Sequence, residues 1–174
     1  DVIGKIANGI ADDMLTTTIM ACKCPKLISP AMNTNMFTNP IVQDNLKKLE
    51  HYGYEIIQPD SGYLACGDTG AGKMPSEQVL LNYILRTIAK DKDMAGIKLT
   101  VTAGPTREKL DPVRFLSNNS TGKMGYAIAK MAMLRGADVT LISGKVSLEP
   151  VPFVKMVDIV SAEDMYNAVI KSAK

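Results

Sequence analysis

Residues 99–136 constrain the fold most, because they predict a strand, a long loop and a helix in direct succession. The alternation of apolar and β-branched residues from Leu99 to Thr102 predicts the strand, and Gly104 ends it. Apolar residues at helical spacing follow the loop, at Met124, Ala127, Ile128 and Met131. They predict a helix that stops at Gly136. A strand that feeds a helix is typical of α/β folds, so we expect that class.

The loop between this strand and helix is a candidate anion site. Its polar and cationic residues are Arg107, Arg114, Asn118, Asn119, Ser120, Thr121 and Lys123, and glycines stand at 122 and 125, where the helix begins. Helix N-termini leave amide donors unpaired and carry partial positive charge, so they suit phosphate or carboxylate groups. A loop of about twenty residues is unusual in a compact domain unless it is functional. The alternative is a surface loop with scattered positive charge.

Two nucleotide-binding templates fail in this loop. A Walker loop needs a glycine five residues before Gly122, where this chain has Ser117. A dinucleotide fingerprint needs three spaced glycines, whereas only Gly122 and Gly125 are present. A Rossmann-type oxidoreductase is therefore disfavoured.

The composition is that of an ordinary α/β protein. The chain has 174 residues, of which 46% are hydrophobic and 22% charged, and its net charge is +2. This charge gives no basic field, so nucleic acid is not an expected partner. No apolar run approaches the ~20 residues of a membrane span, and three cysteines make no disulfide framework. We therefore expect a cytoplasmic protein with no membrane association.

Both ends of the sequence suggest a piece of a larger unit. Asp1 is not a start methionine, and the helix expected from Ala162 has no strand after it. Between them, charge replaces periodicity in residues 90–96, which are the best linker candidate. The sequence thus predicts two parts, residues 1–91 and 92–174.

Several further elements follow from local signals. Expected helices cover 3–12 and 14–22, with a break near Asn8-Gly9 or Asp12-Asp13, where an aspartate can cap the second. Others begin at Pro40 after an Asn39 cap, at Ser76 and at Ser161 with an Asp164 capping box. Expected strands cover 26–29, 54–57, 138–142 and 157–160. Residues 59–75 are too rich in glycine for regular structure, so they predict a mobile loop.

Two segments of the first part carry candidate chemistry. Asn33 lies in PAMNTNMF (30–37), just beyond a predicted strand, where open α/β sheets place their ligands. Cys66 lies in GYLACGDTGAGKM (62–74), with Lys73 seven residues on, and a cysteine on such a loop can deliver a proton. The structural alternatives are turn formation by Asn33 and loop pinning by Cys66. A zinc site made from the three cysteines and His51 is disfavoured by their spacing.

The second part carries a family resemblance. TAGPTREKLDPVRFLSNNSTGKMG (102–125), followed by RGADVTLISG (135–144), resembles the ligase domain of the bifunctional phosphopantothenoylcysteine synthetase/decarboxylase family of coenzyme A biosynthesis. The resemblance implies that CTP and Mg²⁺ activate 4′-phosphopantothenate as an acyl-cytidylate, from which cysteine displaces CMP. It places Asn118 at that intermediate with Arg114 nearby, and puts Gly104, Ser120, Gly122 and Lys123 around phosphate.

The first part resembles the flavin-dependent decarboxylase domain of the same family. The motifs are DVIGKIANGIADDMLTTT (1–18), PAMNTNMF and LACGDTGAGKM, in the family's order. The resemblance implies FMN as the cofactor, phosphopantothenoylcysteine as the substrate, Cys66 as the proton donor and Asn33 at the substrate carboxyl. Met32, Met36 and Lys73 would belong to the substrate clamp, while Phe37 stands where the family often has tryptophan.

The resemblance therefore predicts the end of a flavodoxin-like or Rossmann-like flavoprotein domain in 1–91 and the start of a Rossmann-like ligase domain in 92–174. It implies homo-oligomers with shared sites and small-molecule substrates. The family's flavin loop and catalytic histidine would lie before Asp1, and its lysine-rich loop beyond Lys174, so this chain alone is expected to be inactive. A non-catalytic nucleotide- or flavin-binding module is the alternative.

Overall fold

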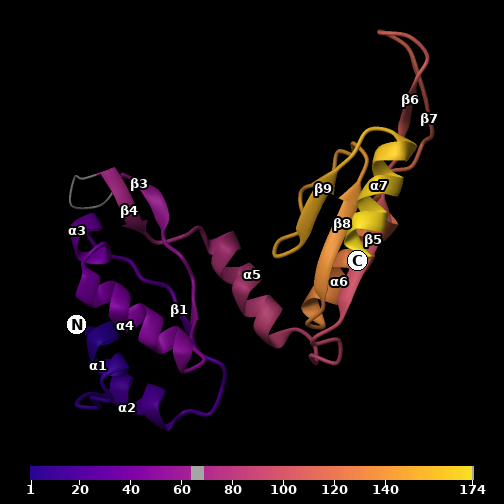
Figure 1. Cartoon of the computed structure of the whole chain (residues 1–174). Helices are drawn as coiled ribbons and strands as arrows, with labels where there is room; N and C mark the ends of the chain where they lie inside the picture. The colour runs from indigo at the N-terminus through magenta and orange to yellow at the C-terminus, as the bar shows by residue number, and fades with distance from the viewer. Residues whose placement is uncertain (64–68, 174) are drawn as a thin grey trace. The chain divides into compact units, whose positions relative to one another are not determined.

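The computed structural model describes residues 1–63 and 69–173, which form two compact units, Asp1–Ile84 and Leu85–Lys174 (Figure 1). Each unit has parallel strands with helices packed on them, so the predicted α/β class is confirmed. Within the described ranges, no helix is long and apolar enough to cross a membrane.

The first unit is built on a parallel pair of short strands. Its elements are α1 (Val2–Ala7), α2 (Met14–Ala21), β1 (Leu27–Ile28), α3 (Thr34–Phe37), α4 (Pro40–His51), β2 (Glu55–Ile56), β3 (Asp60–Tyr63), β4 (Thr69–Lys73) and the start of α5 (Glu77–Ile88). β1 pairs with β2, and α1 packs on α4 around buried Ile6, Leu46 and Leu49. This core fixes the carboxyl end of β1, from which the PAMNTNMF segment leaves.

The predicted helix starts in this unit are confirmed. Asp13 accepts a hydrogen bond from the Thr16 amide at 2.8 Å and forms a capping box with it. The Asn39 side chain accepts from the Ile41 amide at 2.9 Å, and Pro40 occupies the first helical position. In both places a short polar side chain satisfies an amide that the helix leaves unpaired.

The prediction of an irregular loop over residues 59–75 was wrong. β3 and β4 pair as an antiparallel hairpin, with Gly62 opposite Gly70. Its glycines serve close packing: a Cβ on Gly72 would lie 2.1 Å from the Met32 carbonyl oxygen, and the Met32 amide donates to the Gly72 carbonyl at 2.9 Å. Glycine here lets the hairpin join its backbone to the neighbouring segment, which composition alone does not reveal.

The second unit is a three-stranded parallel sheet in the order β5-β8-β9. Its elements are the end of α5, β5 (Lys98–Ala103), β6 (Arg107–Lys109), β7 (Phe115–Ser117), α6 (Lys123–Leu134), β8 (Asp138–Ser143), β9 (Lys155–Asp158) and α7 (Ala162–Ser172). Val139, Leu141 and Ala129 are almost completely buried between β8 and α6. β9 begins and ends two residues before the predicted strand, because it pairs with β8 at Lys155↔Thr140 through Asp158↔Ser143.

The predicted helix is confirmed as α6, but the residues that carry its helical pattern are not the ones that it buries. Met124 is 78% exposed and Ile128 is 48% exposed. The buried residues are Gly125, Ala129, Ala132 and Met133. The narrow face packs because small residues allow a helix to approach a sheet closely, so the larger apolar side chains point away.

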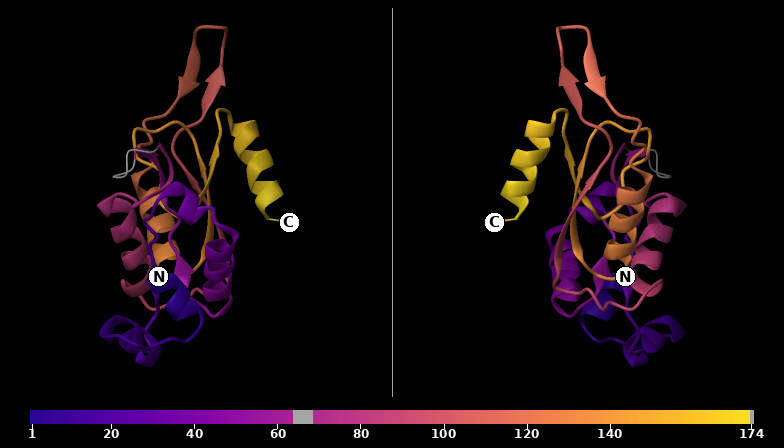
Figure 2. Two further views of the ribbon diagram at one scale, coloured as in Figure 1. Left: turned by 90° about the vertical axis from the view of Figure 1, so that its left-hand side faces the viewer. Right: turned by 90° about the vertical axis from the view of Figure 1, so that its right-hand side faces the viewer.

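The long loop after β5 contains a second hairpin, which extends away from the sheet (Figures 1 and 2). β6 pairs with β7 in the register Arg107↔Ser117, Glu108↔Leu116 and Lys109↔Phe115. The Asp111 carboxylate closes the turn by accepting from the Arg114 amide at 2.7 Å. The predicted loop is therefore an ordered arm that leads into the start of α6.

Candidate functional site

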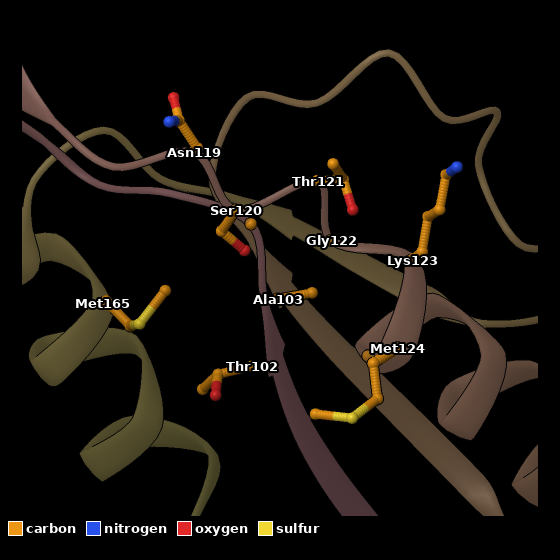
Figure 3. Close-up of a pocket in the computed structure, with 11 residues that line it drawn as sticks. Thr102, Ala103, Asn119, Ser120, Thr121, Gly122, Lys123, Met124 and Met165 are labelled. Atoms are coloured by element: carbon orange, nitrogen blue, oxygen red, sulfur yellow. The ribbon is translucent and has the colours of Figure 1, made fainter.

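A polar cavity of about 470 Å³ lies at the carboxyl end of β5 (Figure 3). Four segments line it: the end of β5, the loop that enters α6, the first residues of α6, and one residue of α7. The lining residues are Thr102, Ala103, Gly104, Asn119, Ser120, Thr121, Gly122, Lys123, Met124, Gly125 and Met165. Ligands of open α/β sheets bind at this end of the strands.

The N-terminus of α6 opens into this cavity. Gly122 is the N-cap residue, with φ of 74° and no side chain to satisfy the first amides of the helix. A Cβ on Gly122 would lie 3.0 Å from the Val146 side chain, so only glycine fits without displacement. The amides of the first turn, the helix dipole and the Lys123 ammonium together favour an anion at this place.

Close backbone contacts build the floor of the cavity. Gly104 has φ of 75°, and a Cβ there would lie 2.9 Å from the carbonyl oxygen of Gly144. The Gly144 amide donates to the Ala103 carbonyl at 2.9 Å, which joins the end of β5 to the chain after β8. Backbone atoms of the end of β5 and of Gly144, rather than side chains, therefore pack together beneath the cavity.

Asn118 shapes the loop next to the cavity. Its side-chain oxygen accepts from the Ser120 amide at 2.9 Å, which forms an Asx turn. Asn118 is exposed and adjoins the cavity-lining residues Asn119 and Ser120. The turn directs the following residues toward the start of α6.

The structure brings four of the predicted phosphate residues together in this cavity: Gly104, Ser120, Gly122 and Lys123. Arg114 lies elsewhere, at the turn of the β6–β7 hairpin, where its Nε donates to Asp111 at 2.5 Å. Hydrogen bonds from the Arg114 and Val113 amides lower the pKa of Asp111 below its ordinary value. Arg114 is therefore held by its own turn rather than by the cavity.

Met165 is a lining residue that the sequence does not identify. It stands in the first turns of α7, across the cavity from Lys123 and Met124 (Figure 3). Its sequence context predicts only a helix start beside the Ser161 capping box. That capping box is confirmed, because the Asp164 amide donates to the Ser161 hydroxyl at 3.1 Å. Proximity to the cavity arises from the fold of the sheet, so no local signal marks it.

In the first unit, the fold brings the PAMNTNMF segment beside β4. Asn33 caps α3 through a 2.8 Å bond from the Asn35 amide, Met36 is 55% exposed, and Lys73 ends β4 in an exposed position. Met32 is joined to Gly72 by the backbone bond described above. Cys66 lies outside the described residues.

Two hydroxyl groups in this region are buried with no hydrogen-bond partner in the described part of the chain. They are Ser29 Oγ, just after β1, and Thr34 Oγ1, which faces Gly70. A buried hydroxyl without a partner is costly, so a polar group from a ligand or from further protein fits here. Ser29 stands at the carboxyl end of its strand, where open α/β sheets place their ligands.

Within residues 1–63 and 69–173, no group of three or more histidine, cysteine, aspartate or glutamate side chains lies close enough to hold a metal ion. His51 is in the last turn of α4, with its ring edge against Tyr52 at a centroid separation of 5.2 Å. Cys22 and Cys24 carry free thiols.

Comparisons with known proteins match both units. Residues 1–89 match the flavoprotein family, and residues 94–174 match the DNA/pantothenate metabolism flavoprotein C-terminal domain. The chain is 47% identical over 173 residues to the coenzyme A biosynthesis bifunctional protein CoaBC of Bacillus subtilis, covering 98% of this chain. Against the Escherichia coli K12 protein of the same name, the identity is 44% over 174 residues, covering 100% of this chain. The chain spans 43% of the length of each of these relatives.

Solved structures of both kinds of domain also match. The C-terminal domain of a CoaBC protein is 51% identical, with 47% of this chain and 41% of that chain covered and a TM-score of 0.45. A PPC decarboxylase mutant complexed with pantothenoylaminoethenethiol is 37% identical, with 47% of this chain and 46% of that chain covered and a TM-score of 0.46. On the family match and the sequence identities, the chain belongs to the flavoprotein family, in the branch of the bifunctional coenzyme A biosynthesis proteins.

Proposed function

We propose that this chain forms parts of two successive enzymes of coenzyme A biosynthesis. Residues 92–174 belong to a CTP-dependent ligase that joins 4′-phosphopantothenate to cysteine. Residues 1–91 belong to an FMN-dependent decarboxylase that converts phosphopantothenoylcysteine to 4′-phosphopantetheine. The order of the two family matches along the chain supports this assignment.

The observation that carries the ligase proposal is the donor-rich cavity at the start of α6. Its donors are main-chain amides, hydroxyl groups and one ammonium group, which suit the oxygens of a triphosphate. They do not suit a bare dication, which prefers carboxylate and carbonyl oxygens. Mg²⁺ therefore enters with the triphosphate of CTP.

The ligase reaction consists of two displacements. The carboxylate of phosphopantothenate attacks the α-phosphorus of CTP, forms an acyl-cytidylate and releases pyrophosphate. The amine of cysteine then attacks the acyl carbon, loses a proton and displaces CMP. Asn118, which adjoins the cavity through its turn with Ser120, orients the intermediate. Lys123, which lines the cavity, and the α6 amides offset the negative charge on phosphate.

In the first unit, the chain supplies binding groups beside its β1 edge. When bound, FMN supplies the oxidation of the substrate thiol that precedes the loss of carbon dioxide. Asn33 holds the substrate carboxyl, Met32, Met36 and Lys73 clamp the substrate, and Cys66 delivers a proton. The buried Ser29 hydroxyl, which has no partner among the described residues, supports a polar ligand at this edge.

An Asn118→Ala substitution tests the ligase proposal in a protein of the relatives' full length. With CTP labelled at its α-phosphate, Mg²⁺, phosphopantothenate and cysteine, the variant should accumulate labelled acyl-cytidylate and release little CMP. Asn45→Ala, on α4 of the first unit, is the control. Normal turnover by Asn118→Ala would remove the role of Asn118, and tight CTP binding without any cytidylate in the unsubstituted protein would favour a non-catalytic binding module.

A further inference from the structure

The cavity of the second unit has walls from segments that are far apart in sequence. Asn119 and Ser120 come from the loop before α6, whereas Met165 comes from α7. Figure 3 shows Met165 on the α7 side of the cavity and Lys123 on the α6 side. The width of the cavity therefore depends on how the loop is held relative to α7.

The β6–β7 hairpin determines where the loop wall begins. Asn118 follows directly after Ser117, the last residue of β7. Ser117 is opposite Arg107 in the ladder, and its hydroxyl donates to the Thr106 carbonyl at 2.7 Å. A shift of β6 would carry Ser117 with it and move the start of the loop wall.

β6 is in turn bound to the N-terminus of α7. The Glu108 carboxylate accepts from the Ala162 amide at 3.0 Å, although 54 residues separate the two in sequence. The Arg107 amide donates to the Val160 carbonyl at 2.7 Å, just before the helix. Ala162 is the first residue of α7, and Met165 follows within one turn. A carboxylate is favourable at this place because of the helix dipole.

We infer that Glu108 is a positioning residue that couples the two walls of the cavity, by tying the hairpin that carries Asn118 to the helix that carries Met165. It touches no ligand itself. Its loss leaves the Ala162 amide without its side-chain acceptor, so that of these two bonds only the one from the Arg107 amide to the Val160 carbonyl still links the hairpin to the start of α7. The inference rests on the proposed function only for the identity of the ligand, CTP.

Amide hydrogen exchange on this chain tests the coupling directly. In Glu108→Ala, exchange of the amides at 118–121 and in the first turn of α7 should accelerate by about tenfold, as expected for loss of a charged hydrogen bond. Glu108→Gln keeps an acceptor of the same length and should stay near the unsubstituted rates. Glu163→Ala removes a carboxylate from the same helical turn without touching the hairpin, so it is the matched control.

The result that would overturn the inference is unchanged exchange in both segments of Glu108→Ala. If this variant does not fold, Glu108→Asp decides, because its shorter side chain keeps the charge but does not span the distance. Exchange in Glu108→Asp should be as fast as expected for loss of the bond, whereas exchange in Glu108→Gln should stay slow. Equal exchange in Glu108→Asp and Glu108→Gln would refute the coupling.

CTP titration of the full-length protein separates this inference from the proposed function. Glu108→Ala should raise the Kd for CTP by about tenfold, with Glu108→Gln restoring most of the affinity. Failure of the unsubstituted protein to bind CTP, with the exchange result intact, would sink the proposed function alone. CTP binding that is equally tight in the unsubstituted protein and in Glu108→Ala would sink the role of Glu108 in the site.

Discussion

Gly125 on α6 lies against Ala103 on β5 so closely that a Cβ on Gly125 would be 2.6 Å from the Ala103 Cβ and 2.9 Å from the Thr102 carbonyl oxygen. All three residues line the cavity. The contact thus fixes the distance between the donor end of α6 and the carboxyl end of β5. Packing and the anion site depend on the same glycine.

Gly125→Ala should therefore reduce both stability and ligand binding. The added methyl group forces α6 away from β5, and overpacking of this kind typically costs about 1–3 kcal/mol of unfolding free energy. Urea unfolding of the second unit, followed by circular dichroism, measures the loss. Lys130→Ala, at an exposed position of the same helix, should stay within about 0.5 kcal/mol of the unsubstituted chain. Equal stability of the two variants would mean that the helix has room to adjust.

The α6 helix also shows what periodicity can and cannot predict. Its bounds follow from local signals, because Gly122 and Gly136 stand on either side of a helical run. Its packed face does not follow from local signals, because Gly125 and Ala129 are buried while the larger Met124 is exposed. Hydrophobicity ranks large side chains as core, whereas close approach to a sheet selects small ones. The shape of the partner surface, which is absent from the sequence, decides between them.

Gly72→Ala should destabilise the first unit. Gly72 has φ of 127°, and the new Cβ would lie 2.1 Å from the Met32 carbonyl oxygen, so both the backbone conformation and the packing oppose a side chain. The expected loss is at least about 2 kcal/mol, because main chain rather than a flexible side chain must move. Thermal unfolding of the chain measures it.

Gly62→Ala is the matched control in the same hairpin. Its nearest neighbour would be the Lys73 side chain at 3.5 Å, which is an ordinary contact. A small effect at Gly62 with a large one at Gly72 would confirm that the hairpin is packed onto the Met32 segment. Similar small effects at both positions would show that this packing does not form in solution.

The α7 helix should weaken in acid. Hydrogen bonds from Ser161, first from its amide at 2.8 Å, and from the Val160 amide lower the pKa of Asp164 below its ordinary value of 3.8. A lowered pKa in the folded state means that ionised Asp164 stabilises the helix above pH 3.8, and this stability is lost as the pH falls through the folded value. Asp164→Asn should therefore flatten the pH dependence in this range.

Unfolding free energies of the second unit between about pH 2 and 6 measure this effect. Glu163→Gln, in the same turn, should leave the slope at low pH close to that of the unsubstituted chain. A slope that persists in Asp164→Asn would assign the acid sensitivity to another carboxylate.

The site itself could be predicted only where it is local in sequence. Ser120, Gly122 and Lys123 fall on one helix start, and a helix start has known chemistry. Met165 reaches the cavity through the order of the strands, and Glu108, which does not line the cavity, is bonded to the first residue of the same helix. Such long-range neighbours depend on topology, so single-sequence patterns do not contain them.

Lys92 is expected to hold the ends of two helices together. Its ammonium group donates to the Arg86 carbonyl in the last turn of α5 at 2.5 Å and to the Leu134 carbonyl at the end of α6 at 2.6 Å. Cations at helix C-termini are favourable because they offset the partial negative charge of the last carbonyls. The neighbouring Asp93 forms an ion pair with Arg135 on the same side of the unit.

Lys92→Met keeps the length and apolar stem of the side chain but removes all three donors, so it should lower the stability of the second unit by about 1 kcal/mol. Lys90→Met, two residues earlier in the same charged run, should have little effect. Because Asp93 and Arg135 form a separate contact, Lys92→Met combined with Asp93→Asn should destabilise more than either alone. Equal melting temperatures for Lys92→Met and Lys90→Met would show that the residues after α5 are a solvated linker rather than a clamp on α6.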